Sequence, residues 1–198
     1  MKKVLMAVFF CLLAVGMLNL AADRETLKNQ VVRLHVVGAS DSEEDQAIKL
    51  QVRDAVLASL KETMQDVTNA EEAKAFLAEN LSMIETTANR VLKEVGCGDT
   101  ASVTLRTEEF GTRVYDTFTL PAGLYDALRI TIGEGEGRNW WCVVFPSLCM
   151  PETTQGFEAV AVGAGFSDDL TDTLTGEYDV RFLLLDLIGQ MENFIHRE

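Results

Sequence analysis

Hydrophobic and polar positions follow three different patterns along the chain. Residues 4–22 are almost continuously apolar, VLMAVFFCLLAVGMLNLAA. Residues 31–38, VVRLHVVG, alternate between core-type and polar side chains, which predicts a β-strand. Residues 43–64 repeat their apolar positions at helical spacing, so we expect an amphipathic helix after the strand. The chain therefore begins with a long apolar segment and continues as a mixture of strand and helix.

The helical region extends to about residue 95. Ser40 or Ser42 can cap its first helix, whose first turn is acidic and so suits the positive end of the helix dipole. Residues 68–71, TNAE, fit a capping box that starts a second helix, and a further box at Ser82 can divide that helix in two. We expect the face of the first helix that carries Lys49 to be solvated.

The second half of the chain is mostly β-like. The alternating runs predict strands over residues 102–106, 113–120, 125–132 and 139–145. Residues 151–176 are expected to form a functional or mobile segment with a short helix at 167–174, and apolar spacing after residue 180 predicts a C-terminal helix. The order predicts one α+β domain. Its sheet is mainly antiparallel, with two or three amphipathic helices between the first strand and the rest.

The N-terminal apolar segment is typical of an export signal. Lys2 and Lys3 precede it, and the small residues Ala21 and Ala22 end it, as in a secretory signal peptide. It is also long enough to cross a bilayer as a helix, so a retained membrane anchor is the other interpretation. In both cases the lysines stay inside. The sequence thus divides into residues 1–22, a signal or anchor, and residues 23–198, an extracytoplasmic domain.

Charge excludes one class of partner. The chain of 198 residues has a net charge of −14, and the part after residue 22 has 31 acidic and 15 basic residues, a net charge of −16. Nucleic acid binding requires basic side chains that displace phosphate counterions, so we expect no nucleic acid partner. Anionic lipid is repelled for the same reason, and membrane contact is expected only through the N-terminal segment.

Three of the four cysteines lie in the exported part. In an oxidising compartment two of them can pair and leave one free. Cys142 and Cys149 are closest in sequence, and Pro146 between them offers a place for the chain to turn. We predict a disulfide between these two cysteines, and the state of Cys97 is left open.

Catalytic chemistry is weakly represented. The run Gly133-x-Gly135-x-Gly137 leads into a predicted strand and carries two glutamates, so it does not match a phosphate-binding loop that opens a helix. A zinc site has no support because the sequence has no CxxC or HxxxH spacing. We therefore predict no catalytic residues, no metal and no cofactor. The alternative is a thiol enzyme in which His35 activates Cys142 or Cys149.

The pair Trp140-Trp141 has a geometric consequence. Adjacent strand residues point to opposite faces, so one indole is expected in the core and the other outside or against a neighbouring element. An exposed tryptophan beside a glycine loop is a typical anchor for a protein partner. Burial of both side chains is nevertheless the interpretation that we favour.

Two blocks of sequence carry a specific resemblance. The first, RLHVVGASDSEEDQ at residues 33–46, continues into KL at 49–50 and VRDAV at 52–56. The second begins with LPAG at 120–123 and ends with NWWCVVFP at 139–146 and Leu148-Cys149. Both blocks resemble the stage II sporulation protein R family, in the expected order behind an export signal, and the resemblance covers residues 30–150. The Asn-Trp-Trp-Cys block is the more specific of the two.

The resemblance implies an intercellular signalling protein of endospore-forming bacteria. Such a protein is made in the forespore and exported across its membrane into the intermembrane space. There it activates a membrane-embedded aspartic-type protease of the mother cell, which cleaves the pro-form of a sigma factor. On this interpretation the chain is a ligand and not an enzyme.

Polar groups beside a tight turn or a glycine loop suit recognition better than core packing. We therefore predict that the residues that contact the partner are Arg33, His35, Asp41, Arg138, Asn139 and Trp140. The rival function is an exported thiol hydrolase that acts on cell-wall or peptide substrates. A purely structural envelope protein is a third and weaker hypothesis.

Overall fold

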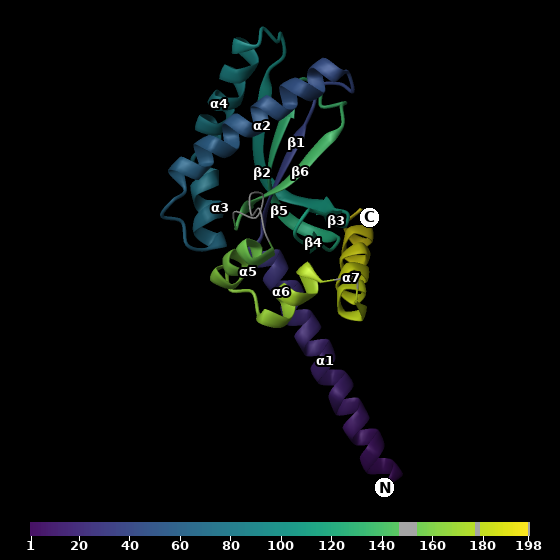
Figure 1. Ribbon diagram of the computed structural model, residues 1–198. Coiled ribbons are helices and arrows are strands. Elements are labelled where there is room, and N and C mark those ends of the chain that lie inside the picture. Colours follow the sequence, from purple (N-terminus) through teal and green to yellow (C-terminus); the bar gives the residue numbers. More distant parts are fainter. Residues whose placement is uncertain (147–153, 177–178, 198) are drawn as a thin grey trace.

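The computed structural model describes residues 1–146, 154–176 and 179–197. Figure 1 shows an α+β body from which one long helix projects, with the N-terminus at its far tip. The body has one four-stranded sheet with helices on both faces, so the predicted fold class is confirmed. Its strands are β1 (Val32–Val37), β2 (Ala101–Phe110), β5 (Gly123–Ile132) and β6 (Asn139–Phe145).

The sheet is mainly antiparallel, but its central pair is parallel. The strand order is β2-β5-β1-β6, in which β1 runs parallel to β5 and the other two pairs are antiparallel. All six residues of β1 are buried, because helices cover both of its faces. Central parallel strands are usually buried in this way.

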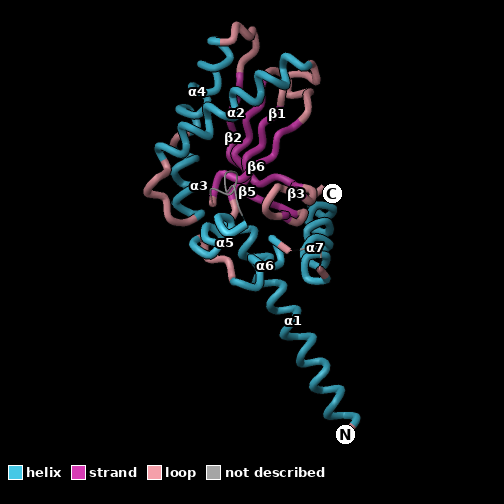
Figure 2. The backbone as a smooth tube through the Cα atoms, in the orientation of Figure 1, coloured by secondary structure: helices cyan, strands magenta, loops and turns pink. Residues whose placement is uncertain are grey.

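Three helices cover one face of the sheet, as Figure 2 shows. Ser42 caps the first of them by accepting a hydrogen bond from the Asp45 amide, and Asn69 caps the second. The predicted division of the second helix is confirmed, but it falls at Asn80, and Ser82 does not provide the cap. The helices are α2 (Glu43–Thr63), α3 (Ala70–Glu79) and α4 (Leu81–Glu94), and they pack on Leu34, Val36, Leu128 and Ile130.

The predicted solvation of Lys49 is wrong. Its side chain is buried, and Nζ donates to the carbonyl oxygen of Arg138 (2.8 Å) and to the side chain of Gln46. The helical period placed Lys49 on the polar side of α2. The loop that leads into β6 covers that part of the helix and supplies the carbonyl, so the lysine is buried and also paired.

The opposite face of the sheet has a second core. The predicted strand over residues 113–120 is instead a short hairpin of β3 (Arg113–Val114) and β4 (Thr119–Leu120), which the bond from the Tyr115 amide to the Phe118 carbonyl closes. The predicted C-terminal helix is confirmed as α7 (Val180–His196). Buried aromatic side chains dominate this core, among them Phe110, Tyr125, Phe157 and Phe182.

Residues 154–176, expected as a functional or mobile segment with one short helix, contain two helices. The structure has α5 (Thr154–Gly163) before the predicted short helix, which is present as α6 (Asp168–Thr175) with Ser167 as its cap. Phe157 and Ala161 bury one side of α5 in the second core. The sequence did not predict α5 because Gly156 and Gly163 weaken its helical signal, although Phe157 and Ala161 pack well in the folded protein.

The N-terminal helix α1 (Lys2–Gln30) continues past the predicted boundary at residue 22. It is the one described helix long and apolar enough to cross a membrane. Its last two turns belong to the body. Leu27 is fully buried, the Asp23 carboxylate accepts two bonds from Arg181, and Arg24 pairs with Glu192. The apolar segment and the domain are therefore joined by a rigid helix and not by a linker.

Candidate functional site

A polar cluster crosses the sheet at His35. This side chain is almost fully buried on β1. Its Nδ1 lies 2.7 Å from a carboxylate oxygen of Glu108 on β2, and its Nε2 lies 2.8 Å from the side-chain oxygen of Asn139 on β6. Because an ionised carboxylate can only accept, the proton of Nδ1 points to Glu108. The imidazole is thus held at both nitrogens, and three strands are tied together through it.

Glu108 is the negative centre of this cluster. Its other oxygen accepts from Arg106 (2.7 Å) and from Arg129 (3.3 Å). Burial alone would raise the pKa of Glu108, but the hydrogen bonds from His35 and Arg106 and the positive charge nearby outweigh burial and lower the pKa to about 2. Glu108 is therefore ionised at any physiological pH. We call His35, Arg106, Glu108, Arg129 and Asn139 the polar cluster.

Trp141 covers the histidine. The two rings are stacked with centroids 3.8 Å apart, and the Arg113 guanidinium lies 4.9 Å from the indole. Beside this stack is a cavity of about 420 Å³ between residues 113–118 of the hairpin and residues 139–142 of β6. The buried cluster thus reaches the surface at the hairpin.

Arg33 lies on the same face of β1 but is fully buried. Its Nη2 donates to the Tyr115 hydroxyl (2.9 Å), while Nε and Nη1 have no hydrogen-bond partner among the described residues. The guanidinium lies over the rings of Phe110 (4.3 Å) and Tyr125 (5.0 Å), whose faces attract a cation. In this conformation Arg33 has no surface to offer a partner and supports the aromatic core.

The glycine-rich loop forms a second part of the site. The Gly137 amide donates to the Gly38 carbonyl, and Asp41 accepts from the Arg138 amide (2.7 Å). A Cβ at Gly137 would lie 2.2 Å from the Ser40 carbonyl oxygen, so only glycine allows the two loops to approach this closely. Burial lowers the pKa of Lys49, which fastens the same loop to α2.

The outer side of this loop carries exposed recognition-type residues. The side chains of Asp41 and Arg138 are 64% and 69% exposed and lie close enough to form an ion pair. Trp140 is 38% exposed, and its ring lies 4.2 Å from the Arg53 guanidinium. We call Asp41, Arg138, Asn139 and Trp140 the loop face.

Five of the six predicted contact residues are brought together. Four form the loop face, and Asn139 connects it to His35 below. Arg33 lies apart in the aromatic core. The sequence did not single out Glu108, which is 73 positions from His35 and is one of 31 acidic residues. Only the strand register brings these two residues together.

The prediction that both tryptophans are buried is wrong, and the two indoles lie on opposite faces of the sheet.

The thiol dyad does not form with Cys142. In the strand register His35 lies opposite Trp141, whereas Cys142 lies opposite Leu34 and packs against the helical face with it. Cys149 lies outside the described residues, so the predicted disulfide stays a prediction, while Cys11 and Cys97 have free thiols. Within the described ranges no group of three or more histidine, cysteine or acidic side chains could hold a metal ion.

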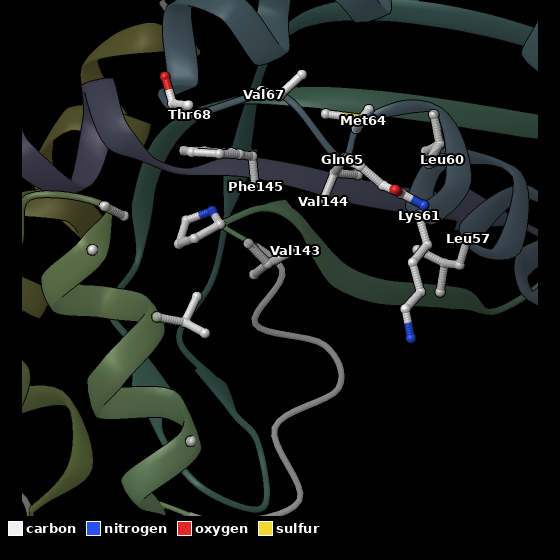
Figure 3. A pocket seen from close by; sticks show the side chains of 15 residues that line it. Leu57, Leu60, Lys61, Met64, Gln65, Val67, Thr68, Val143, Val144 and Phe145 are labelled. Atoms are coloured by element: carbon white, nitrogen blue, oxygen red, sulfur yellow. The ribbon is translucent and has the colours of Figure 1, made fainter.

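A larger groove lies away from the polar cluster. Its volume is about 620 Å³, and Figure 3 shows apolar side chains from α2 and from the end of β6 around it. None of its described lining residues belongs to the polar cluster or to the loop face. The groove borders Pro146, where the first described range ends.

The fold and the site place the chain in a class of α+β domains that follow an apolar N-terminal helix. In this domain, buried polar residues link three strands of the sheet and hold an exposed loop in place. The family model of stage II sporulation protein R (spore_II_R) matches residues 28–155, and the chain belongs to this family. It is 35% identical over 169 residues to stage II sporulation protein R of Bacillus subtilis (strain 168). The alignment covers 80% of this chain and 75% of that protein. No solved structure matches the chain.

Family membership confirms the resemblance that the two sequence blocks carry. The matched range begins in the last turn of α1 and ends at the start of α5. It therefore includes the polar cluster and the loop face. The chain has a role in sporulation, as the family does.

Proposed function

We propose that this chain is an intercellular signal of endospore formation, which activates a membrane-embedded aspartic-type protease. On this proposal the protease processes the pro-form of a mother-cell sigma factor. Family membership and the apolar N-terminal helix support the proposal. The N-terminal segment would direct export of the protein across the forespore membrane, and the protein would act in the intermembrane space.

The loop face is the observation that carries the proposal. A binding surface needs exposed side chains on a backbone that is already ordered, because ordering a loop on binding costs entropy. Backbone hydrogen bonds and Lys49 hold the loop, while Trp140 and Arg138 remain accessible. Tryptophan and arginine are the residue types that most often dominate binding energy at interfaces.

The role of the polar cluster in this proposal is positioning. His35 holds the side chain of Asn139, and Asn139 lies between Arg138 and Trp140 in the chain. The charge of Glu108 fixes His35 in turn. His35 and Glu108 are buried, so they would act on the partner through the loop face and would not touch it.

Reconstitution tests the proposal. The protease, its pro-sigma substrate and this chain are co-expressed in a host without sporulation proteins, and cleavage of the substrate is followed by immunoblotting. We expect cleavage to depend on this chain. Equal cleavage without the chain would refute the signalling role.

Surface variants in the same assay test the contact surface separately. We expect Arg138→Ala and Trp140→Ala to lower cleavage about tenfold or more, in keeping with the truncation of residues that dominate an interface. The matched control is Arg90→Ala, which removes an exposed arginine from α4. If Arg138→Ala and Arg90→Ala behave alike while cleavage still requires the chain, the signalling role stands but the loop face is not the contact surface.

A further inference from the structure

Helix α7 has two apolar faces, and the body uses only one. Phe182, Leu185 and Gly189 are buried against the second core. On the opposite side, large apolar side chains recur three or four positions apart and are 45–72% exposed. They are Val180, Leu183, Leu184, Leu187, Met191, Phe194 and Ile195. Such a continuous exposed stripe is unusual for a soluble protein surface and indicates a contact.

The stripe continues the apolar surface of α1. A hollow of about 470 Å³ lies between the two helices. Its wall is mostly apolar and includes two polar side chains, Asn19 and Arg181. The other lining residues are Leu12, Gly16, Met17 and Leu20 from α1 and Val180 and Leu184 from α7. Figure 1 shows α7 at the end of the body from which α1 projects. The start of α7 therefore lies beside the last third of the apolar segment.

The depth of the first turns of α7 in the membrane favours lipid over a protein partner as the molecule that covers them. Residues 4–22 form a helix roughly 28 Å long, which matches the hydrocarbon thickness of a bilayer. When this segment spans the membrane, Gly16 and Leu20 lie in the outer leaflet, so the first turns of α7 reach the same depth. Whatever surrounds the end of the apolar segment also surrounds Val180 and Leu184.

Charge agrees with this placement. The charged side chains of α7 between residues 180 and 195 are Arg181, Asp186 and Glu192, and each has a partner on the body. Arg181 pairs with Asp23, Glu192 pairs with Arg24, and Asp186 accepts from the Ala122 amide. The exposed stripe therefore carries no unpaired charge that would have to be desolvated.

We propose that residues 4–22 are retained as an anchor, and that the first turns of the exposed stripe, at Val180 and Leu184, lie in the outer leaflet of the membrane that they cross. The later part of the stripe follows the body away from the bilayer, since Glu192 pairs with Arg24, just beyond the apolar segment. Membrane contact thus extends beyond the N-terminal segment. With two attached helices the body has a fixed orientation. The turn between β5 and β6, which carries the loop face, lies at the end of the body away from the N-terminus of α1 (Figure 1) and points away from the membrane. The proposal requires no protease and is independent of the proposed function.

Photo-crosslinking of the full chain tests the lipid contact. The photoreactive residue p-benzoylphenylalanine replaces Val180 in one variant and Leu184 in another, because both are exposed and lie beside the apolar segment, and each protein is reconstituted in phosphatidylcholine vesicles. The control places the same residue at Glu44, an exposed position at the start of α2. Circular dichroism and tryptophan fluorescence identify any variant that has not folded, and the two stripe positions replace each other in that case.

We expect lipid adducts, read by mass spectrometry of the tryptic peptides, to be at least tenfold more abundant at the stripe positions than at Glu44. Equal lipid labelling at stripe and control positions would overturn the proposal. Adducts to a second copy of the chain in place of lipid would also overturn it. So would a mass of the protein from its native membrane that lacks residues 1–22, because the anchor sets the depth of α7.

Discussion

Glu108→Gln removes one charge from the centre of the polar cluster and keeps the shape of the side chain. The amide oxygen can still accept a hydrogen bond from His35, but the side chain no longer neutralises the positive charges of Arg106 and Arg129. We expect this substitution to destabilise the folded protein at neutral pH. The loss should fall as the pH is lowered.

The magnitude follows from the pKa of Glu108. A fall from 4.5 to about 2 corresponds to about 3 kcal/mol of stabilisation at pH 7, at about 1.4 kcal/mol per pKa unit. Arg106 is 55% exposed, and solvent screens its share, so we expect a loss of about 2 to 3 kcal/mol. Because the folded-state pKa is depressed, this stabilisation is fully present above the unfolded pKa of about 4.5 and disappears as the pH falls through about 2. At pH 3 it should have lost roughly 60% of its value at pH 7.

Urea unfolding of the full chain in mild detergent measures both effects. Tryptophan fluorescence is a suitable signal because Trp140 and Trp141 are the two tryptophans of the sequence and lie beside the cluster. The control is Glu62→Gln, which removes the charge of an exposed acid on α2 and should change the free energy of unfolding by less than about 0.5 kcal/mol at either pH. The reasoning is refuted if Glu108→Gln costs less than about 0.5 kcal/mol at pH 7, or if its cost is equal at pH 7 and pH 3.

Three further predictions concern packing and the cysteines. In the same urea titration, Gly189→Ala should lower the free energy of unfolding by more than about 2 kcal/mol, because its Cβ would lie 1.7 Å from the Ala122 carbonyl oxygen. The control Gly163→Ala should be nearly neutral, because the space around Gly163 is open. Lys49→Met should speed hydrogen exchange of the glycine-loop amides at least tenfold, because the loop loses its bond to α2, and unchanged exchange would show that the backbone bonds alone hold it. Mass spectrometry of unreduced tryptic peptides should show Cys142 linked to Cys149, and alkylation of both without reductant would contradict this pairing.

Local patterns in the sequence determined much of the fold. The alternation in β1 and the helical spacing in α2 and α7 are properties of neighbouring residues, and a segment that buries one face must show them. The helix cap at Ser42 and the apolar N-terminal segment are local in the same sense. Two sequence blocks also identified the family. Polar residues beside a turn or a glycine loop predicted six contact residues, of which Asp41, Arg138, Asn139 and Trp140 lie together on one face, while His35 and Arg33 are buried.

Tertiary structure decided what depends on contacts between distant residues. The parallel pairing of β1 with β5 brings together segments about 90 residues apart, and no local period encodes it. The burial of Lys49 depends on a carbonyl 89 positions away, and the partnership of His35 with Glu108 depends on the register of three strands. The same register puts Cys142 on the face away from His35. A sequence shows which residues can be buried or charged. The packing of the strands and helices decides which of them meet, because the energy of a buried polar group depends on the partner that the fold supplies.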